Sequence, residues 1–423
     1  MSDLYPMLSV EEAQARVLDH FRALPPERVP VLDVLGRVLA EDVFAQGDIP
    51  PYANTAMDGY ALLAADTAGA TSDRPRRLRI IADLAAGYVA TEQVAAGTAI
   101  RIMTGAPMPA GADSVVPFED TAREGEWVQV RTAVHVGANV RAAGEDVRQG
   151  EMVLVRGKRL RAQEIGMLAA LGYKDVAVHR RPRVAILATG DELVPIDAPL
   201  GPGKIRDANS YSNAAQVLAC GGVPVMLGIA RDQVSELTAM IKSGLAQNVD
   251  LFLSSGGVSV GDFDVVKQVL AAEGEITFWR VRMKPGKPLA FGRIGGVPMV
   301  GLPGNPVSAM VSFELLVRPA ILTMQGLTRL ERPAVQAVLV DAIRDKPDRR
   351  LYLRVRVREQ EGEYRAYLTG EQGSGILRSM VEANGLAVVP EGRSLAPGER
   401  VRVILLDADE RCEVPQVPQH GNA

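Results

Sequence analysis

Acidic and hydroxyl side chains gather in three glycine-rich segments whose composition suits the binding of an anion. The segments are Thr189-Gly190-Asp191-Glu192, residues 254–264 (SSGGVSVGDFD) and residues 303–308 (PGNPVS). Glycine lets a ligand approach the backbone, and hydroxyl and amide N–H groups at a helix start suit phosphate. None of the segments fits the Walker A or GxGxxG pattern, so an ordinary nucleotide-binding loop is not indicated. The alternative is that these residues only form turns and helix caps.

A set of acids falls at or next to predicted strand ends. It comprises Asp191, Glu192, Asp207, Asp232, Asp262 and Asp264. Converging carboxylates repel one another unless a cation joins them, and all-oxygen ligands select Mg²⁺, which bridges carboxylate and substrate phosphate. The acids therefore indicate a cleft that holds a divalent cation beside an anion. Asp232 and Asp264 could instead be helix caps.

Basic side chains surround the turn MKPGKP at residues 283–288. They are Arg280, Arg282, Lys284 and Lys287. Two lysines three residues apart on a loop stiffened by proline can direct their ammonium groups toward one anion, and Ser308 could add a hydroxyl. The alternative is a solvated basic strand edge. The four histidines show no paired spacing and the two cysteines form no CxxC, so the sequence disfavours histidine acid–base chemistry and a zinc site.

Apolar strands alternate with helices from residue 183 onward. We expect strands at 183–189, 223–229, 250–256, 276–283 and 297–302, and helices that begin near residues 210, 232, 264 and 306. This order predicts a parallel sheet with helices on both faces, in which ligands bind beyond the carboxyl ends of the strands. Because the three glycine-rich segments follow such ends, they should outline one cleft.

The rest of the chain predicts further modules. Helices are expected at 9–21, 31–43 and 162–171, and short alternating strands at 77–160 and after 332. The fold class is therefore multidomain α/β plus β, with a parallel-sheet α/β domain and a C-terminal β-barrel-like domain. The expected boundaries are 1–45 and 144–178 for an N-terminal helical linker domain, 46–143 for an inserted β domain, 179–330 for the α/β domain, 331–408 for the C-terminal β domain and 409–423 for a tail.

Composition and charge exclude several classes of function. The 423 residues carry 47 Lys and Arg against 51 Asp and Glu, so no overall positive field would hold a nucleic acid. The N-terminus lacks the layout of a secretory signal, and the longest uncharged run, 294–313, is interrupted by glycine and proline. We expect a cytoplasmic protein that binds neither nucleic acid nor membrane and holds its anion locally.

Eight motifs, in order along nearly the whole chain, resemble those of the molybdopterin molybdenumtransferases, bacterial enzymes similar to the E domain of gephyrin. The motifs are TAMDGY (55–60), RIMTGAPMP (101–109), GEDV (144–147), TGDEL (189–193), RDAN (206–209), SSGGVSVGDFD (254–264), MKPGKP (283–288) and LPGNPVS (302–308). The resemblance implies insertion of molybdate into adenylyl-molybdopterin, which gives molybdenum cofactor and AMP. It also implies dependence on Mg²⁺, a homodimer with a cleft completed by the second subunit, and partners that make adenylyl-molybdopterin or accept the finished cofactor.

The resemblance also assigns roles to residues. The candidate catalytic residues are Asp58, Asp146, Glu192, Asp232, Asp264, Arg280 and Lys284, and the candidate metal ligands are Glu192, Asp232 and Asp264. The candidate binding residues for the pterin, phosphate and molybdate are Thr104, Gly190, Asp191, Asp207, Asn209, Ser255, Gly256, Gly257, Ser259, Gly261, Lys287, Pro303, Asn305, Pro306, Ser308, Arg349 and Ser374. Asp58, Thr104 and Asp146 are implied to approach the partner chain, whereas Arg349 and Ser374 rest on a looser match.

The sequence departs from the family pattern at two places. Gly261-Asp262-Phe263-Asp264 stands where the family often has Gly-Glu-X-Asp, which favours Asp264 over Asp262 as the functional acid, and Arg280 stands where many relatives have lysine. Two alternative functions are a molybdopterin adenylyltransferase, because the α/β domain alone resembles that activity, and a gephyrin-like scaffold. The additional N- and C-terminal modules disfavour the first, and the intact acidic and MKPGKP motifs disfavour the second.

Overall fold

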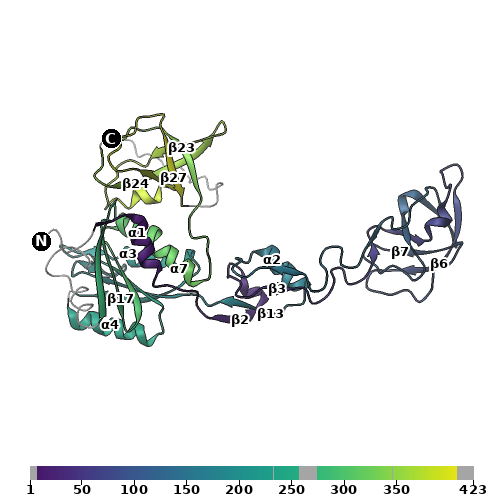
Figure 1. The fold of residues 1–423 in the computed structure, drawn as a ribbon, viewed down its shortest axis with the longest axis horizontal. Helices are drawn as coiled ribbons and strands as arrows, with labels where there is room; N and C mark the ends of the chain where they lie inside the picture. Colours follow the sequence, from purple (N-terminus) through teal and green to yellow (C-terminus); the bar gives the residue numbers. More distant parts are fainter. Residues whose placement is uncertain (1–6, 232, 257–273, 345, 407–423) are drawn as a thin grey trace. The chain divides into compact units, whose positions relative to one another are not determined.

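The computed structural model describes residues 7–231, 233–256, 274–344 and 346–406. The chain divides into two compact units (Figure 1). Unit 1 consists of Met1–Glu27, Gly36–Val38 and Val178–Ala423, and unit 2 consists of Arg28–Leu35 and Leu39–Ala177. The three predicted strand-end segments all belong to unit 1.

A seven-stranded sheet forms the centre of unit 1. In spatial order its strands are β1 (Met7–Leu8), β19 (Gly274–Val281), β21 (Pro288–Ile294), β22 (Val297–Leu302), β18 (Leu251–Ser255), β14 (Arg183–Thr189) and β17 (Val223–Ala230). The last four pair in parallel, as the sequence predicts. However, β21 pairs antiparallel with both β19 and β22, so the expectation of a wholly parallel sheet is wrong.

Strand β21 was not expected from the sequence. A two-residue turn reverses the chain direction between β21 and β22. Gly295 and Gly296 join β21 to β22 with positive φ angles of 56° and 83°. Both angles lie in the left-handed region that two-residue hairpin turns require and that glycine adopts without strain. The sheet is consequently mixed, with its parallel part at β22, β18, β14 and β17.

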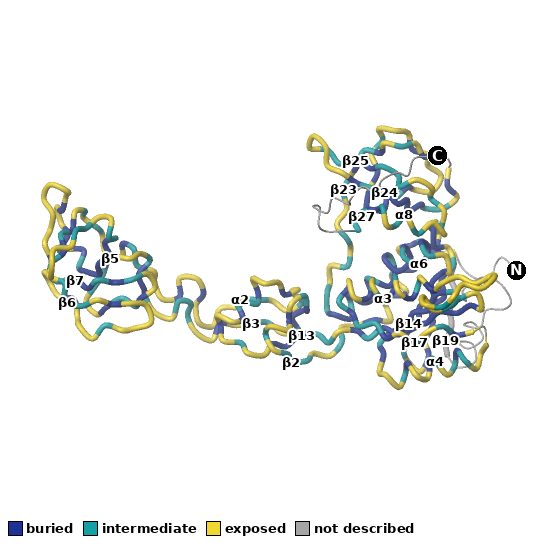
Figure 2. Tube along the Cα trace, turned by 180° about the vertical axis from the view of Figure 1, so that it is seen from behind, coloured by how far each residue is buried: buried dark blue, intermediate teal, exposed yellow. Residues whose placement is uncertain are grey.

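Helices cover both faces of the sheet. They are α1 (Val10–Leu18), α3 (Asn209–Ala219), α4 (Val234–Ala246), α6 (Pro306–Ser312), the π-helical turn η4 (Phe313–Val317) and α7 (Arg318–Met324). Val184 and Ile186 of β14 join a core with residues of α1, α6 and α7, whereas Ala185 and Leu187 join a second core with α4 (Figure 2). The alternation follows from the two-residue period of a strand.

The first helix and the long apolar helix both follow from their sequences. Ser9 and Glu12 form the predicted capping box of α1, with the Glu12 N–H donating to Ser9 Oγ over 3.1 Å. Residues Pro306–Met324 form one continuous helical stretch that is long and apolar enough to cross a membrane. Because 78% of its most apolar window is buried inside the protein, this stretch has the character of a core helix.

A small barrel completes unit 1. Its strands are β20 (Met283–Lys284), β23 (Ala334–Leu339), β24 (Arg350–Gln360), β25 (Glu363–Leu368), β26 (Gly385–Val389) and β27 (Arg400–Leu405), and α8 (Arg378–Val381) precedes β26. Strand β24 pairs with both β25 and β26, so the five strands from β23 to β27 close on themselves. The predicted barrel-like C-terminal module is therefore confirmed.

Unit 2 contains a six-stranded sheet. In spatial order its strands are β8 (Ser114–Pro117), β5 (Gly59–Leu62), β7 (Thr98–Ile102), β6 (Arg76–Leu84), β10 (Trp127–Val130) and β9 (Thr121–Glu124). The remaining short elements are η1 (Val31–Val34), β3 (Val43–Phe44), β4 (Asn54–Thr55), η2 (Ala64–Thr67), η3 (Phe118–Asp120), β11 (Val140–Arg141), β12 (Met152–Leu154) and α2 (Ala162–Ala170), while β2 (Pro26–Pro30) and β13 (Asp175–His179) lie at the boundaries. This agrees with the β module expected at residues 77–160.

The helix expected at residues 31–43 is absent. A single 3₁₀ turn, η1, occupies residues 31–34, and Val43 and Phe44 form a strand that pairs with β12. The turn ends at Leu35, whose ψ of 125° is extended, and Gly36 follows with a φ of 73°, which a right-handed helix does not allow. The helix expected at 162–171 is present as α2.

Candidate active site

Three strand ends meet at one edge of the parallel part of the sheet. Strands β14, β18 and β22 are neighbours, so Gly190, Gly256 and Gly304 follow adjacent carboxyl ends. A Cβ on Gly256 would lie 2.7 Å from the Thr189 carbonyl oxygen, and a Cβ on Gly304 would lie 3.8 Å from Gly256 Cα. The close approach of the loops therefore requires glycine at position 256, and the described residues of the three segments meet at this edge.

The Thr189–Glu192 segment folds back on itself. Gly190 has a φ of 144°, and a Cβ there would meet the Glu192 carboxylate at 2.5 Å. Beyond it, β15 (Leu193–Val194) pairs in parallel with β16 (Ile205–Arg206), and Lys204 Nζ donates to the Asp191 carbonyl oxygen. These contacts hold the carboxylates of Asp191 and Glu192 at the carboxyl end of β14.

Asp207 and Asn209 position the start of α3. The Asp207 carboxylate is 4% exposed and accepts a hydrogen bond from the Ser210 N–H at 3.0 Å. Asn209 Nδ2 donates to the Gly304 carbonyl oxygen at 2.7 Å, which joins α3 to the PGNPVS loop. Both side chains thus hold elements of the site in place, and their contacts to a ligand remain predictions.

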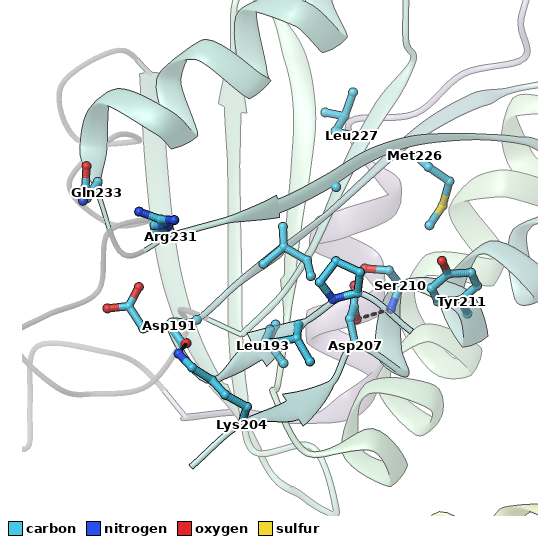
Figure 3. A pocket seen from close by; sticks show the side chains of 15 residues that line it. Asp191, Leu193, Lys204, Asp207, Ser210, Tyr211, Met226, Leu227, Arg231 and Gln233 are labelled. Carbon is cyan, nitrogen blue, oxygen red and sulfur yellow. Dashed lines mark hydrogen bonds between the residues drawn. The ribbon is translucent and has the colours of Figure 1, made fainter. Parts of the chain in front are cut away.

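A pocket of about 910 Å³ lies beside this edge, next to strand β17 (Figure 3). Asp191, Lys204 and Arg231 lie at one end of the pocket, and Tyr211 and Met226 lie at the other. Ser210, 1% exposed, lines the pocket with a hydroxyl that has no hydrogen-bond partner. An apolar pocket with a few convergent polar groups is the usual form of a small-molecule site. The charged end suits an anion, and the apolar end suits a ring.

The MKPGKP turn packs against the first turns of the apolar helix. A Cβ on Gly286 would lie 2.6 Å from Ser312 Oγ of α6, and the φ of Gly286 is 104°. Lys284 and Lys287 are exposed, while Arg280 is half-buried on β19. The turn therefore presents two ammonium groups on a backbone fixed against α6.

Arg349 lies against the neighbouring acid Asp348. Its Nε donates to both carboxylate oxygens of Asp348 at 3.1 Å. This hydrogen bond lowers the pKa of Asp348, and the charge of Lys284 contributes in the same direction. Arg349 and Lys284 thus flank one acid, and Arg349 is partly neutralised.

The C-terminal barrel reaches the PGNPVS loop through Ser374. Ser374 Oγ accepts from Asn305 Nδ2 at 3.0 Å, and the Ser374 carbonyl oxygen accepts from the Val307 N–H at 3.1 Å. Ser308 lies next to this contact and is 5% exposed. Ser374 therefore lies against the first turn of α6, and its contact to a ligand stays a prediction.

Arg354 is a residue that the sequence analysis missed. Its side chain is fully buried, and it donates to Ser379 Oγ at 3.0 Å and to the Gly373 carbonyl oxygen at 3.1 Å. Burial lowers its pKa to about 10. Burial of a guanidinium against neutral acceptors lowers the free energy of unfolding. Arg354 lies under the loop that carries Ser374, so we expect it to have a role beyond the fold. Its signal in the sequence is an arginine within the apolar strand Leu351–Val355.

Three predicted residues belong to unit 2. Asp58 Oδ1 accepts from both the backbone N–H and the hydroxyl of Thr104, each at 2.7 Å. These two hydrogen bonds lower the pKa of the exposed Asp58 carboxyl. Asp146 is also exposed, and its N–H donates to the Ile49 carbonyl oxygen at 3.0 Å.

Several predicted residues lie outside the described residues. They are Asp232, Gly257, Ser259, Gly261, Asp262 and Asp264. Of the predicted metal ligands, Glu192 alone is described, and the described part of the chain contains no group of three His, Cys, Asp or Glu side chains placed to hold a metal ion. The metal site consequently stays a prediction.

The chain matches three family models in order. Residues 8–172 match "MoeA N-terminal region (domain I and II)", residues 185–323 match "Probable molybdopterin binding domain", and residues 336–406 match "MoeA C-terminal region (domain IV)". The molybdopterin molybdenumtransferase 2 of Mycobacterium tuberculosis is 39% identical over 391 residues, which cover 91% of this chain and 96% of that protein. The chain belongs to the molybdopterin molybdenumtransferase family.

Other molybdopterin molybdenumtransferases and a solved structure agree with this assignment. The Bacillus subtilis enzyme of that name is 34% identical over 415 residues, 96% of each chain. A crystal structure of the molybdopterin biosynthesis MoeA protein from Pyrococcus horikoshii superposes with a TM-score of 0.82 at 33% identity, and the match covers 95% of this chain and 99% of that one. The resemblance inferred from the eight motifs is therefore confirmed.

Proposed function

We propose that this transferase of molybdenum cofactor biosynthesis inserts molybdenum from molybdate into adenylyl-molybdopterin and releases AMP. The observation that carries the proposal is the convergence of Gly190, Gly256 and Gly304 at one sheet edge beside the 910 Å³ pocket. Such an edge is where open α/β sheets bind ligands. The apolar end of the pocket suits a ring system, and its charged end suits the phosphates.

The molybdate dianion would bind between the MKPGKP turn and the first turn of α6. Lys284, Lys287 and Ser308 supply cationic and hydroxyl donors for a tetrahedral oxyanion. Arg349 is the fourth predicted donor, although its bond to Asp348 would have to be shared with the anion. Ser374 adds a hydroxyl from the barrel, and the buried Arg354 holds the neighbouring Gly373 in place. These groups bind and orient the anion while the adenylyl group leaves.

Mg²⁺ is proposed as the cofactor. The donor set fits it in kind, because Asp191 offers carboxylate oxygens at the charged end of the pocket, Glu192 follows it in the sequence, and hard cations prefer oxygen. Glu192, Asp232 and Asp264 would hold the ion, which when bound would neutralise charge on the pyrophosphate. The acids would orient the phosphate chain through the ion that they hold.

We further propose that the protein acts in the cytoplasm as a homodimer. Asp58, Thr104 and Asp146 of unit 2 would then complete the cleft of the partner chain, and Arg280 would contribute charge next to Lys284. The protein would receive its substrate from the enzyme that makes adenylyl-molybdopterin and pass the cofactor to an acceptor or chaperone. The exposed and pre-organised Asp58 carboxylate supports this arrangement, since an exposed acid seldom needs two short hydrogen bonds.

The test is AMP release from adenylyl-molybdopterin as molybdate is varied. In Lys284→Ala, we expect the KM for molybdate to rise about tenfold or more, with little change in binding of adenylyl-molybdopterin, because one charge-assisted contact to the oxyanion is lost. Lys242→Ala, an exposed lysine on α4, is the matched control and should behave as wild type. If Lys284→Ala weakened the use of molybdate and the binding of adenylyl-molybdopterin equally, Lys284 would not contact the oxyanion. Detection of ATP-dependent adenylylation of molybdopterin would contradict the proposed reaction.

A further inference from the structure

An acid lies among the basic side chains that we propose as donors to molybdate. Arg349 Nε donates to both carboxylate oxygens of Asp348 at 3.1 Å, and among the residues that the structure describes the Arg349 side chain has no other partner. The Arg349 side chain is 21% exposed, whereas that of Asp348 is 75% exposed. A largely buried guanidinium is thus paired with an acid that is open to solvent.

Backbone contacts place Asp348 beside the MKPGKP turn. Strand β20, which begins this turn, pairs in parallel with β24, and Lys284 lies opposite Leu351. Asp348 comes shortly before β24 in the chain. Pro347, directly before Asp348, is buried, and its carbonyl oxygen accepts from the Gly392 N–H at 2.7 Å. The backbone on both sides of Asp348 is therefore anchored, next to the turn that carries Lys284.

The charges around Asp348 are those of the proposed molybdate donors. The hydrogen bond from Arg349 lowers the pKa of the Asp348 carboxyl, and the charge of Lys284 adds to this effect. Asp348 is therefore ionised at neutral pH. A carboxylate and a tetrahedral oxyanion offer similar pairs of oxygen atoms to a guanidinium. Asp348 consequently makes the kind of contact to Arg349 that molybdate would make.

We propose that Asp348 sets the affinity for the oxyanion, because its carboxylate competes with molybdate for Arg349. The inference rests on the proposed function, since it requires Arg349 to be a donor to the anion. An anion that enters must share the guanidinium with Asp348 or displace the acid, and the negative charge of the acid repels the anion in either case. The acid thereby keeps common anions such as sulfate from filling the site, and it also weakens the binding of molybdate.

The experiment measures AMP release by the full-length protein as molybdate is varied. In Asp348→Asn we expect the KM for molybdate to fall about threefold or more, with kcat within about twofold of wild type, because the amide keeps the shape of the acid and loses its charge. Damage to the fold would lower kcat or raise the KM, so a lower KM at unchanged kcat distinguishes lost competition from lost structure. Asp348→Ser replaces the Asn variant should that one not fold.

Sulfate and a second acid provide the controls. Sulfate is also a tetrahedral dianion, so it should inhibit Asp348→Asn at about one third of the concentration that inhibits wild type, or less. Glu363→Gln removes a comparable exposed acid from the same barrel, since Glu363 on β25 pairs with Arg400 at 3.0 Å. This variant should match wild type in its KM for molybdate and in its inhibition by sulfate.

A double variant shows whether Asp348 acts through Arg349. In the background of Arg349→Gln, Asp348→Asn should lower the KM for molybdate by much less than in wild type, because no guanidinium is left for the acid and the oxyanion to compete for. An unchanged or higher KM in Asp348→Asn, or an equal decrease with and without Arg349, would overturn this inference and leave the proposed function intact. Absence of molybdate-dependent AMP release from wild type would overturn both.

Discussion

At the scale of single residues, Gly256 decides whether the candidate site can close. It combines a φ of 85° with a space so narrow that a Cβ would lie 2.7 Å from the Thr189 carbonyl oxygen. Gly296, in the hairpin between β21 and β22, has nearly the same φ, 83°, but open space around it. An alanine at either position would be strained by the left-handed backbone, but only at position 256 would its Cβ also clash with a neighbouring carbonyl oxygen.

We predict that Gly256→Ala destabilises unit 1 by about 2–4 kcal/mol, whereas Gly296→Ala costs about 1 kcal/mol. The extra cost arises because β14 and β18 must separate at their carboxyl ends to admit the methyl group. Chemical denaturation of both variants would measure it. Gly256→Ala should also weaken substrate binding, while Gly296→Ala should bind as wild type. An equal loss of stability in the two variants would show that the loops yield to a Cβ.

At the scale of elements, strand β24 of the barrel carries a buried cation, Arg354. Arg354 on β24 donates to Ser379 and Gly373, which are at either side of the loop that carries Ser374. In the sequence, Arg356 lies two residues further along the same strand, half-buried, with its Nε 3.3 Å from the Glu382 carbonyl oxygen. The two arginines thus share a strand and differ in burial and in nearness to Ser374.

We predict that Arg354→Met leaves stability unchanged or raises it by about 1 kcal/mol, because a buried charge on neutral partners is replaced by an apolar chain of similar shape. Molybdate-dependent AMP release should nevertheless fall at least tenfold, since the loop that carries Ser374 loses the anchor that Arg354 provides at Gly373. Arg356→Met should change neither. The measurements are thermal unfolding and AMP release. A destabilised but fully active Arg354→Met would show that Arg354 serves the fold alone.

The same elements show what the sequence can and cannot predict. Strands β14, β18 and β22 are continuous apolar runs followed by glycine, so their order and the meeting of their ends were predictable. Strand β21 was missed because the chain reverses after it at two glycines, Gly295 and Gly296, without a change in the period of the hydrophobic residues. Arg354 was missed because burial of a charge depends on the loop of residues 372–379 folding over it, a contact that no local pattern encodes.

At the scale of the whole molecule, the predicted site residues fall in two separate units. Lys284 and Gly256 belong to unit 1, and Asp58 and Thr104 belong to unit 2. We have proposed that unit 2 of one chain completes the cleft of its partner in a homodimer. Symmetric dimers of this kind contain two identical sites, and each site draws residues from both chains.

This arrangement predicts complementation between two impaired variants. At a molybdate concentration well below the raised KM of Lys284→Ala, Asp58→Ala and Lys284→Ala should each release little AMP, because every site of either homodimer lacks one group. When the two are mixed and allowed to exchange, half of the dimers carry one chain of each kind, and one of their two sites receives both intact groups. The mixture should therefore reach about one quarter of the wild-type rate. Light scattering should show a dimer throughout. If the mixture stays as inactive as its components although exchange is complete, then Asp58 and Lys284 act within one chain.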